Sequence, residues 1–341
     1  MAETVLINVT LYSRPDCKLC DEVREDLKSL QKKFPHRLAE VNIDSDPTLQ
    51  KAYFDQIPII EVGPYKLKAP ITRKSLEMTL GAASDRRGQL EQVGGEAFQE
   101  RVRQGRTVSR SDGIYFWISK HYLALLNFVV FLYVGFPFLA PVLMKINVTV
   151  PARVIYTMYS PLCHQFAFRS FFLFGEQPYY PLKEAGLVGV KTLQDITGYT
   201  DLANPYSISR LYARQFKGDA TVGYKVALCE RDVAIYGAIV LFGLIYALTK
   251  RRLPPLQWAL WILIGLGPIG LDGFSQLFSQ MNWPWLAHYI PYRESTPFLR
   301  VLTGALFGFT TAWFAYPNIE ESMKETRQFF IKKFAVAKVG S

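Results

Sequence analysis

The sequence predicts two domains of different class, an α/β domain followed by an all-α transmembrane domain. The chain has 341 residues, more than one average domain requires. Residues 1–83 alternate short β-branched runs with periodic helical stretches and carry 12 basic and 12 acidic groups. Residues 122–316 carry 15 basic and 9 acidic groups and include long apolar stretches without any charge. These stretches are long enough to cross a bilayer.

The first domain is predicted to have the element order β-α-β-α-β-β-α. Apolar, β-branched runs indicate strands, and apolar residues at helical spacing indicate helices. The strands are expected at residues 5–12, 38–43, 57–62 and 65–68. The helices are expected at residues 21–33, 48–54 and 72–80.

Cys17 and Cys20 fall on the turn between the first strand and the first helix. The amide groups and dipole of a first helical turn stabilise a thiolate, so we expect Cys17 to attack and Cys20 to resolve the mixed disulfide. Lys18 favours the thiolate, whereas Asp16 and Asp21 oppose it. Half of a zinc site and a non-catalytic pair are the alternatives. A zinc site needs two further ligands, and only His36 is near in sequence.

The stretch of residues 11–21, Leu-Tyr-Ser-Arg-Pro-Asp-Cys-Lys-Leu-Cys-Asp, resembles the glutaredoxin-like branch of the thioredoxin fold. The resemblance covers about 80 residues. It implies a thioredoxin-like fold, a protein thiol or disulfide as partner, and a cis peptide bond before Pro58. It also implies that Pro58 and Lys18 border the substrate groove. Glutathione-using glutaredoxins carry Gly-Gly and an acidic residue after the last strand, where residues 69–74 here read Ala-Pro-Ile-Thr-Arg-Lys.

Four transmembrane helices are expected at residues 122–144, 229–249, 256–278 and 297–316. The first is 23 residues long and uncharged. At about 1.5 Å per residue it spans about 35 Å, more than the roughly 30 Å of a hydrocarbon core. Glycine and proline interrupt the third, at Gly265, Gly267, Pro268 and Gly270.

Basic groups predict the orientation of these spans. Lys and Arg cluster before the first span, at residues 250–252 and after the fourth, which places both termini in the cytoplasm of a prokaryotic cell. Residues 84–121 form a basic linker with a juxtamembrane helix, and residues 317–341 a basic cytoplasmic tail. The first ten residues do not resemble a secretory signal. The net charge of +10 lacks a dense basic stripe, so it marks topology and excludes nucleic-acid binding.

Residues 145–228 are then expected on the outer face. Residues 151–174 are apolar but contain Arg153, His164 and Arg169, which predicts a re-entrant or interfacial helix. Making this stretch span the membrane would place residues 250–252 outside, against the distribution of basic residues. Gly-, Pro- and Tyr-rich loops are expected between residues 175 and 225.

Four ligand-capable residues are expected at matching depth near this face, namely Cys163, His164, Cys229 and Asp232. Together they offer S, N, S and O donors for zinc or another transition metal. A disulfide between Cys163 and Cys229 is a second interpretation, since an oxidising outer face permits it. Two free thiols packed as small hydrophobic groups are the third.

Six short motifs stand in this half of the chain: Cys-His-Gln at 163–165, Arg-Ser-Phe at 169–171, Cys-Glu-Arg-Asp at 229–232, Leu-Asp-Gly-Phe-Ser-Gln at 271–276, Arg-Glu-Ser at 293–295 and Leu-Arg-Val-Leu-Thr-Gly at 299–304. With these motifs, residues 122–316 resemble an uncharacterised prokaryotic membrane family, domain of unknown function 2085. The motif at 229–232 usually reads Cys-x-Arg-Cys in that family, whereas this chain has Asp232 last. A carboxylate can bind a metal but cannot form a disulfide.

Six polar residues are expected to form a pocket in the membrane, namely Arg169, Arg231, Asp272, Gln276, Arg293 and Arg300. Asp272 and Arg300 are expected to form an ion pair beneath the Cys/His group, because an unpaired charge there is costly. The alternative to a purely structural ion pair is that Asp272 and Arg300 help this pocket to bind an anionic, metal or quinone-like ligand. Trp283, Trp285 and Tyr289 are expected to form an interfacial belt.

Two functions fit these features. The first is a membrane-anchored thiol–disulfide oxidoreductase, and the alternative is a membrane metal- or small-ligand-binding or transport protein with a regulatory thiol domain. Protein thiols, membrane lipid and a second copy of the chain are the expected partners. The predicted topology puts Cys17 inside and Cys163 outside. Electron transfer between them across roughly 30 Å of hydrocarbon would require a quinone, a metal or a conformational shuttle.

Overall fold

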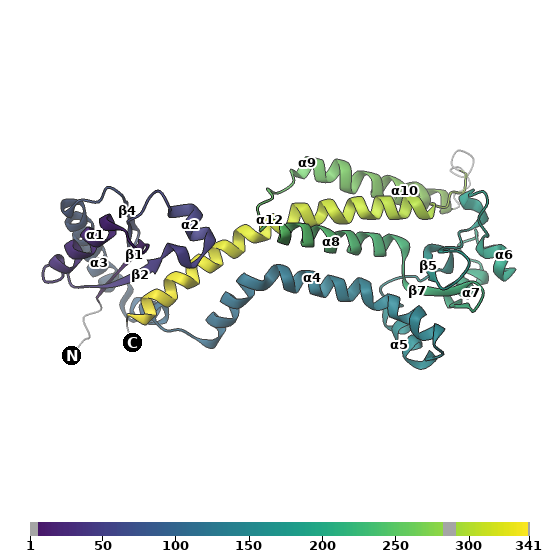
Figure 1. Cartoon of the computed structure of the whole chain (residues 1–341), viewed down its shortest axis with the longest axis horizontal. Helices are drawn as coiled ribbons and strands as arrows, with labels where there is room; N and C mark the ends of the chain where they lie inside the picture. The colour runs from purple at the N-terminus through teal and green to yellow at the C-terminus, as the bar shows by residue number, and fades with distance from the viewer. Residues whose placement is uncertain (1–5, 282–290, 340–341) are drawn as a thin grey trace. The chain divides into compact units, whose positions relative to one another are not determined.

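The computed structural model describes residues 6–281 and 291–339, which form two compact units (Figure 1). The first unit combines Met1–His121 with Glu321–Ser341, and the second is Tyr122–Glu320. The aromatic belt expected at Trp283, Trp285 and Tyr289 lies outside the described residues.

The first unit contains a four-stranded mixed sheet in the order β2-β1-β3-β4. The strands are β1 (Ile7–Ser13), β2 (His36–Asn42), β3 (Ile59–Val62) and β4 (Tyr65–Lys68). The helices are α1 (Lys18–Leu30), α2 (Pro47–Tyr53) and α3 (Arg73–Arg106). β1 pairs parallel with β2 and antiparallel with β3, and β3 pairs antiparallel with β4. This topology confirms the predicted element order and the thioredoxin-like fold.

The two faces of the sheet bury different side chains. Val9 and Leu11 pack with α1 and α3 on one face. Tyr12 and Ile59 pack with α2 on the other, where Ile331 and Ala335 also contact them. Both of the latter residues belong to α12 (Pro297–Lys338), so the C-terminal part of that helix covers the second face of the sheet.

From residue 321 to residue 339, the basic tail expected at residues 317–341 is therefore a folded part of the first unit. Arg327 Nε lies 3.7 Å from Asp46 Oδ2, and Lys332 Nζ lies 2.7 Å from a Glu61 carboxylate oxygen. Burial acts to raise the pKa of Glu61, but Lys332 and Lys66 hold it below its usual value. The expectation followed the charges of this segment and overlooked its apolar residues at helical spacing.

The expected linker is mostly helical. α3 continues to Arg106, with a bend at Gly95, where φ is 48°. The Arg106 guanidinium donates a 2.8 Å hydrogen bond to the Leu6 carbonyl, which ties the end of this helix to the start of β1. The next helix, α4 (Arg110–Lys145), begins four residues later.

Within the described ranges, four helices that run through the second unit are long and apolar enough to cross a membrane, which confirms the four predicted spans. They are α4, α8 (Glu230–Leu248), the continuous stretch Trp258–Gln280 and α12. Their membrane parts run side by side in Figure 1. Large apolar side chains such as Phe128, Leu263 and Leu271 are exposed on them. Such faces are stable in contact with lipid, and the chain is therefore a membrane protein.

The third span is irregular where glycine and proline were expected to interrupt it. α9 (Trp258–Leu260) passes into π-helical turns at Trp261–Leu266 and then into α10 (Gly267–Gln280). Pro268 lies in the first turn of α10. Proline has no amide hydrogen to donate to the preceding turn, and it is tolerated in the first turn of a helix. The π-helical turns therefore end just before Pro268, where the regular α-helix begins again.

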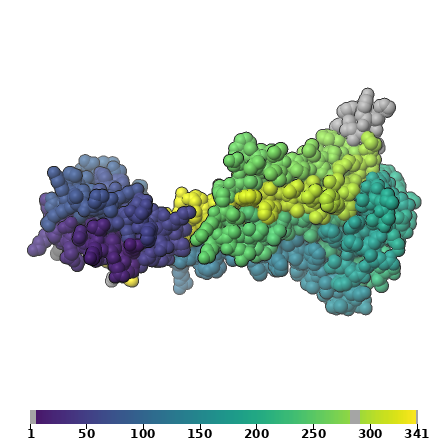
Figure 2. All heavy atoms as spheres, turned by 45° about the horizontal axis from the view of Figure 1, so that its top comes forward, coloured from purple at the N-terminus to yellow at the C-terminus, as the bar shows by residue number. Residues whose placement is uncertain are grey.

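The segment 145–228 is a small folded subdomain, which corrects the expectation of an all-α membrane domain. Only α5 (Thr149–Tyr159) of the expected re-entrant stretch is α-helical. The short strands β5 (Ser170–Leu173), β6 (Gly218–Asp219) and β7 (Gly223–Cys229) form an antiparallel sheet in the order β5-β7-β6. The helices α6 (Leu193–Thr197) and α7 (Ile208–Gln215) complete it. Its atoms form a compact teal group in Figure 2.

This subdomain has its own core, built around Phe168, Phe172, Tyr180 and Leu202. The Tyr180 hydroxyl donates to the Val222 carbonyl at 3.1 Å. Tyr180, one of the aromatic residues that suggested loops, is thus a core residue, whereas Tyr206 is exposed.

Gly304 and Gly308, four residues apart on α12, lie directly against α8. A Cβ atom at Gly308 would stand 2.1 Å from the Ile235 carbonyl oxygen, and one at Gly304 2.7 Å from that of Arg231. Small residues at this spacing let two membrane helices approach closely. The contact between α8 and α12 therefore depends on the absence of side chains at these two positions.

We predict that Gly308→Ala destabilises the protein by about 1–3 kcal/mol, because the new methyl group forces the helices apart. Gly237→Ala on α8 is the matched control, since no atom lies within 4 Å of its added Cβ. It should be neutral or slightly stabilising, as alanine favours helix. Thermal unfolding of the full-length protein in detergent measures both. Equal stability of the two variants would contradict this packing.

Candidate functional site

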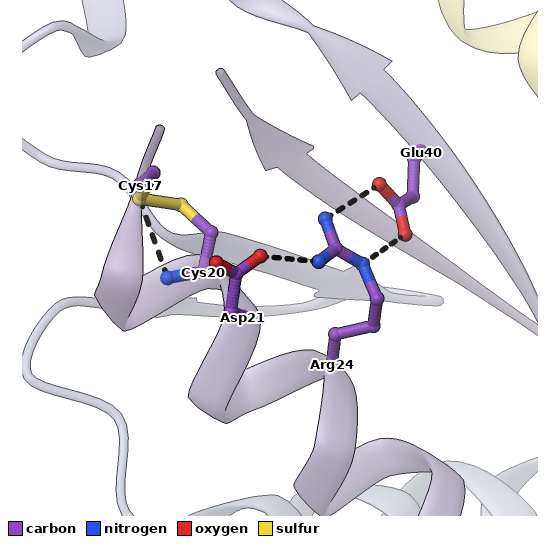
Figure 3. Close-up of a disulfide and its surroundings, with 5 residues drawn as sticks. All are labelled: Cys17, Cys20, Asp21, Arg24 and Glu40. Carbon is purple, nitrogen blue, oxygen red and sulfur yellow. Dashed lines mark hydrogen bonds and ion pairs between the residues drawn. A yellow bond between two sulfur atoms is a disulfide. The ribbon is translucent and has the colours of Figure 1, made fainter. Parts of the chain in front are cut away.

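Cys17 and Cys20 form a disulfide at the start of α1 (Figure 3). Cys17 is the N-cap of the helix, and its Sγ accepts a hydrogen bond from the Cys20 amide at 3.3 Å. Cys20 is only 1% exposed, whereas Cys17 is half-buried. The two cysteines therefore differ in exposure: Cys17 is partly accessible, and Cys20 is buried.

Charged neighbours of the disulfide are arranged on α1 and β2. Arg24 donates to both carboxylate oxygens of Glu40, at 2.7 and 3.0 Å, and also pairs with Asp21 (Figure 3). Arg24 thus offsets the negative charge of Asp21 that was expected to oppose the Cys17 thiolate. Lys18, the first residue of α1, is exposed on one side of Cys17, and Asp16 is exposed on the other.

The peptide bond before Pro58 is cis, as the resemblance implied. Tyr12 of β1 lies opposite Ile59 of β3 in the sheet. Pro58 therefore stands at the end of the sheet where β1 leads into the turn that carries Cys17. Its place in a substrate groove stays a prediction. A second cis peptide bond, before Pro70, was not expected.

Three of the four residues expected at the outer cluster come together in the second unit. The Sγ atoms of Cys163 and Cys229 and a carboxylate oxygen of Asp232 all lie within 4.8 Å of one another. Both cysteines are free thiols. His164 is not in this group, because its exposed ring stacks on Phe166 with 5.8 Å between the ring centres. The side chain next to Cys163 along the chain points away, so the expected four-donor set is reduced to three.

Two residues hold the Cys163 turn: Gln165, which the sequence analysis quoted only as part of a motif, and Lys225, which it did not name. Gln165 is buried, and its side-chain amide donates to the carbonyls of Tyr156 and Ala227, at 2.9 and 3.1 Å. Lys225 is 1% exposed, and its ammonium donates to the carbonyls of Gln165 and Arg214, at 2.7 and 2.6 Å. Burial lowers the pKa of Lys225 to about 7. In the sequence, the signal for this hydrogen-bonding role was a lysine inside the apolar run of β7.

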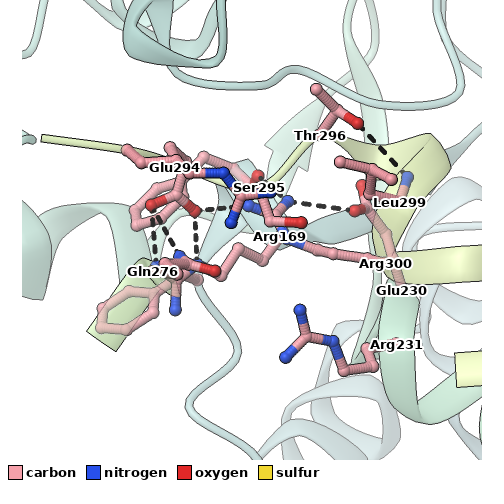
Figure 4. Close-up of polar contacts among 12 residues, drawn as sticks. Arg169, Glu230, Arg231, Gln276, Glu294, Ser295, Thr296, Leu299 and Arg300 are labelled. Atoms are coloured by element: carbon pink, nitrogen blue, oxygen red, sulfur yellow. Dashed lines mark hydrogen bonds and ion pairs between the residues drawn. The ribbon is translucent and has the colours of Figure 1, made fainter. Parts of the chain in front are cut away.

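A network of buried charges lies at the same end of the second unit (Figure 4). Glu294 is its centre. This carboxylate accepts two hydrogen bonds from Arg169, at 2.7 and 2.9 Å, and one from Gln276 at 2.9 Å, and it also pairs with Arg300. Burial acts to raise the pKa of Glu294, but Arg169 and Arg300 hold it below its usual value. The carboxylate is therefore charged and fully paired.

The predicted ion pair between Asp272 and Arg300 is wrong. Arg300 pairs with Glu230, at 3.2 Å, and with Glu294. Asp272 instead pairs with Arg231 at 2.5 Å and Arg293 at 2.8 Å. The sequence analysis quoted both glutamates within motifs but did not count them as partners, and it therefore assigned Arg300 to the remaining carboxylate.

All six residues of the expected polar pocket nevertheless belong to this one network. A cavity of about 430 Å³ lies beside it, and Ser275, Tyr292, Arg293, Glu294 and Leu299 are among its lining residues. Four arginines face three carboxylates, so the network carries one excess positive charge. Among the described residues, one Glu230 carboxylate oxygen and the Arg231 Nε atom have no hydrogen-bond partner.

The opposite end of the second unit is where the chain enters and leaves it. The Tyr122 hydroxyl donates to Glu320 at 2.8 Å, and Arg251 lies 3.2 Å from the same carboxylate. α8 connects the two ends, from Cys229 before its first turn to Leu248 at its last. Its 19 residues correspond to about 28 Å at about 1.5 Å each. Both connections to the first unit are therefore a helix length away from the Cys163 group.

Comparison with known proteins identifies both parts of the chain. Residues 8–81 match the family model of the glutaredoxin-like domain (DUF836), and residues 220–314 match that of a predicted membrane protein family (DUF2085). The second match includes Cys229, Asp232 and the motifs around Asp272 and Arg300. It begins after Cys163, which it therefore does not include. An uncharacterized protein of Methanocaldococcus jannaschii is 26% identical over 210 residues, 59% of this chain and 93% of that protein. No solved structure matches the chain.

We predict that Glu294→Gln destabilises the second unit by about 3–5 kcal/mol, because it leaves Arg169 and Arg300 buried without their shared anion. The matched control is Glu176→Gln, which breaks an exposed pair with Lys191 and should cost less than about 1 kcal/mol. Thermal unfolding of full-length protein in detergent compares the two. A Glu294→Gln variant as stable as the control would show that the network does not stabilise this unit.

Proposed function

We propose that this chain is a membrane-anchored thiol–disulfide oxidoreductase in which Cys17 attacks and Cys20 resolves. The observation that carries the proposal is the unequal access of the two sulfur atoms at a helix N-terminus: Cys17 is partly accessible and Cys20 is buried. A thiolate at the N-cap is stabilised by the amide groups of the first turn and by the helix dipole. The match to a glutaredoxin-like domain adds support.

The exchange requires only the two thiols and a substrate disulfide. The Cys17 thiolate attacks one substrate sulfur, so that a mixed disulfide forms and the other substrate sulfur leaves as a thiolate. The Cys20 thiolate then attacks the Cys17 sulfur. This closes the Cys17–Cys20 disulfide and releases the second substrate thiolate, which takes its proton from water. The substrate gains two electrons, and the domain loses two.

A protein is the substrate that fits the surface beside Cys17. Leu19, between the two cysteines, is 54% exposed, and Lys18 next to it is exposed as well. An apolar side chain and a cation beside the accessible sulfur suit an extended peptide that carries a disulfide. The motif of glutathione-using relatives is not present at residues 69–74, which favours a protein partner over glutathione.

We further propose that both termini are cytoplasmic. Lys250, Arg251 and Arg252 follow α8 at the end where the chain enters and leaves the second unit. Basic residues at that end favour the cytoplasmic side. The Cys17–Cys20 pair would then work in a reducing compartment, and Cys163 and Cys229 would lie toward the outer face.

We predict that Cys17→Ser abolishes reduction of a disulfide substrate such as insulin by the reduced full-length protein. Cys20→Ser should instead accumulate the mixed disulfide with the substrate, because the resolving thiol is missing. Ser29→Ala, an exposed position on α1, is the control and should retain full activity. Turnover and mass spectrometry of the trapped species measure these effects. Activity that survives Cys17→Ser would refute the proposal.

A further inference from the structure

The thiol chemistry at Cys17 leaves the second cysteine group unexplained. Cys163, Cys229 and Asp232 lie in the second unit and take no part in the proposed exchange. Three ligand atoms of two kinds, thiol sulfur and carboxylate oxygen, stand within 4.8 Å of one another. In a tetrahedral zinc site, bonds of about 2.0–2.3 Å put neighbouring ligand atoms about 3.5–3.8 Å apart. A small contraction of the group would reach that geometry.

The three positions are fixed by the fold rather than by flexible loops. Cys229 is the last residue of β7 and the N-cap of α8, where its sulfur accepts from the Asp232 amide at 3.5 Å. Asp232 follows one turn later on the same helix. Cys163 follows α5, and its amide donates to the Tyr159 carbonyl at 3.0 Å. The sheet, α5 and α8 therefore bring all three side chains to one point.

The buried Lys225 side chain lies next to the Cys163 turn, where its amino group donates to the Gln165 carbonyl at 2.7 Å. Metal binding requires thiolates, and metal coordination itself displaces their protons.

We propose that Cys163, Cys229 and Asp232 bind a thiophilic divalent cation, zinc in the first instance. Cysteine thiolates and aspartate carboxylates are both zinc ligands. Three protein ligands leave the fourth position to water or to an exogenous ligand, as in catalytic zinc sites. The carboxylate distinguishes this group from a redox-active cysteine pair, because Asp232 has no role in disulfide formation.

The test uses full-length protein with Cys17→Ser and Cys20→Ser, so that the other dithiol cannot bind metal. Zinc content is measured after purification, and zinc affinity by competition with a chromogenic chelator under reducing conditions. We expect one zinc ion per chain. Asp232→Asn should weaken binding by more than the roughly 10–100-fold that a lost outer-shell partner costs, and Cys163→Ser should abolish it. Glu176→Gln, an exposed carboxylate of the same subdomain, should leave binding unchanged.

Three outcomes would overturn the proposal. The first is no zinc binding by the reduced, folded parent protein. The second is zinc binding that Asp232→Asn leaves unchanged. The third is a Cys163–Cys229 disulfide found by mass spectrometry in protein that binds no metal after reduction. Asp232→Asn removes no thiol and keeps the side-chain volume, so size-exclusion chromatography establishes that it remains folded.

Discussion

The buried carboxylate of Glu294 is the group on which the second unit depends. A charge at the edge of a hydrocarbon layer is stable only when it is paired and hydrogen-bonded. Glu294 meets this condition with Arg169 of the 145–228 subdomain, Gln276 of α10 and Arg300 of α12. It thus joins the subdomain to two helices. Arg300 extends the same network to a third, through Glu230 at the start of α8, which follows Cys229 in sequence.

α12 contributes to both units. Its first turns supply Arg300 to the charge network, Gly304 and Gly308 lie against α8, and Ile331 and Ala335 cover the second face of the thiol-domain sheet. The glutaredoxin-like domain therefore takes part of its own core from the C-terminal end of the chain. A fragment of residues 1–83 lacks this cover, which is why the proposed activity is best measured on the full-length protein.

The sequence predicts the glutaredoxin-like topology well, because its strands and helices follow regular apolar periods and the Cys17–Cys20 motif sits at one defined turn. It also predicts the four spans, since length and apolar content decide them. It fails where tertiary contacts override local pattern. β6 has only two residues, too few to show a period, and a lysine interrupts the apolar run of β7. Arg300 could be paired correctly only after Glu230 and Glu294 were known to lie beside it. Charge alone suggested a tail at residues 317–341, whereas buried Phe330 makes that helix part of a core.

The central claim is that the two cysteine sites face different compartments, with the thiol exchange inside and the Cys163 group outside. Cysteine accessibility in sealed membrane vesicles of known orientation tests it most directly. In a Cys17→Ser, Cys20→Ser background, the exposed positions Met78 of the first unit and Val188 of the outer subdomain are each replaced by cysteine. A membrane-impermeant maleimide should label Met78→Cys only from the cytoplasmic side and Val188→Cys only from the opposite side. Labelling of both positions from the same side would contradict the claim.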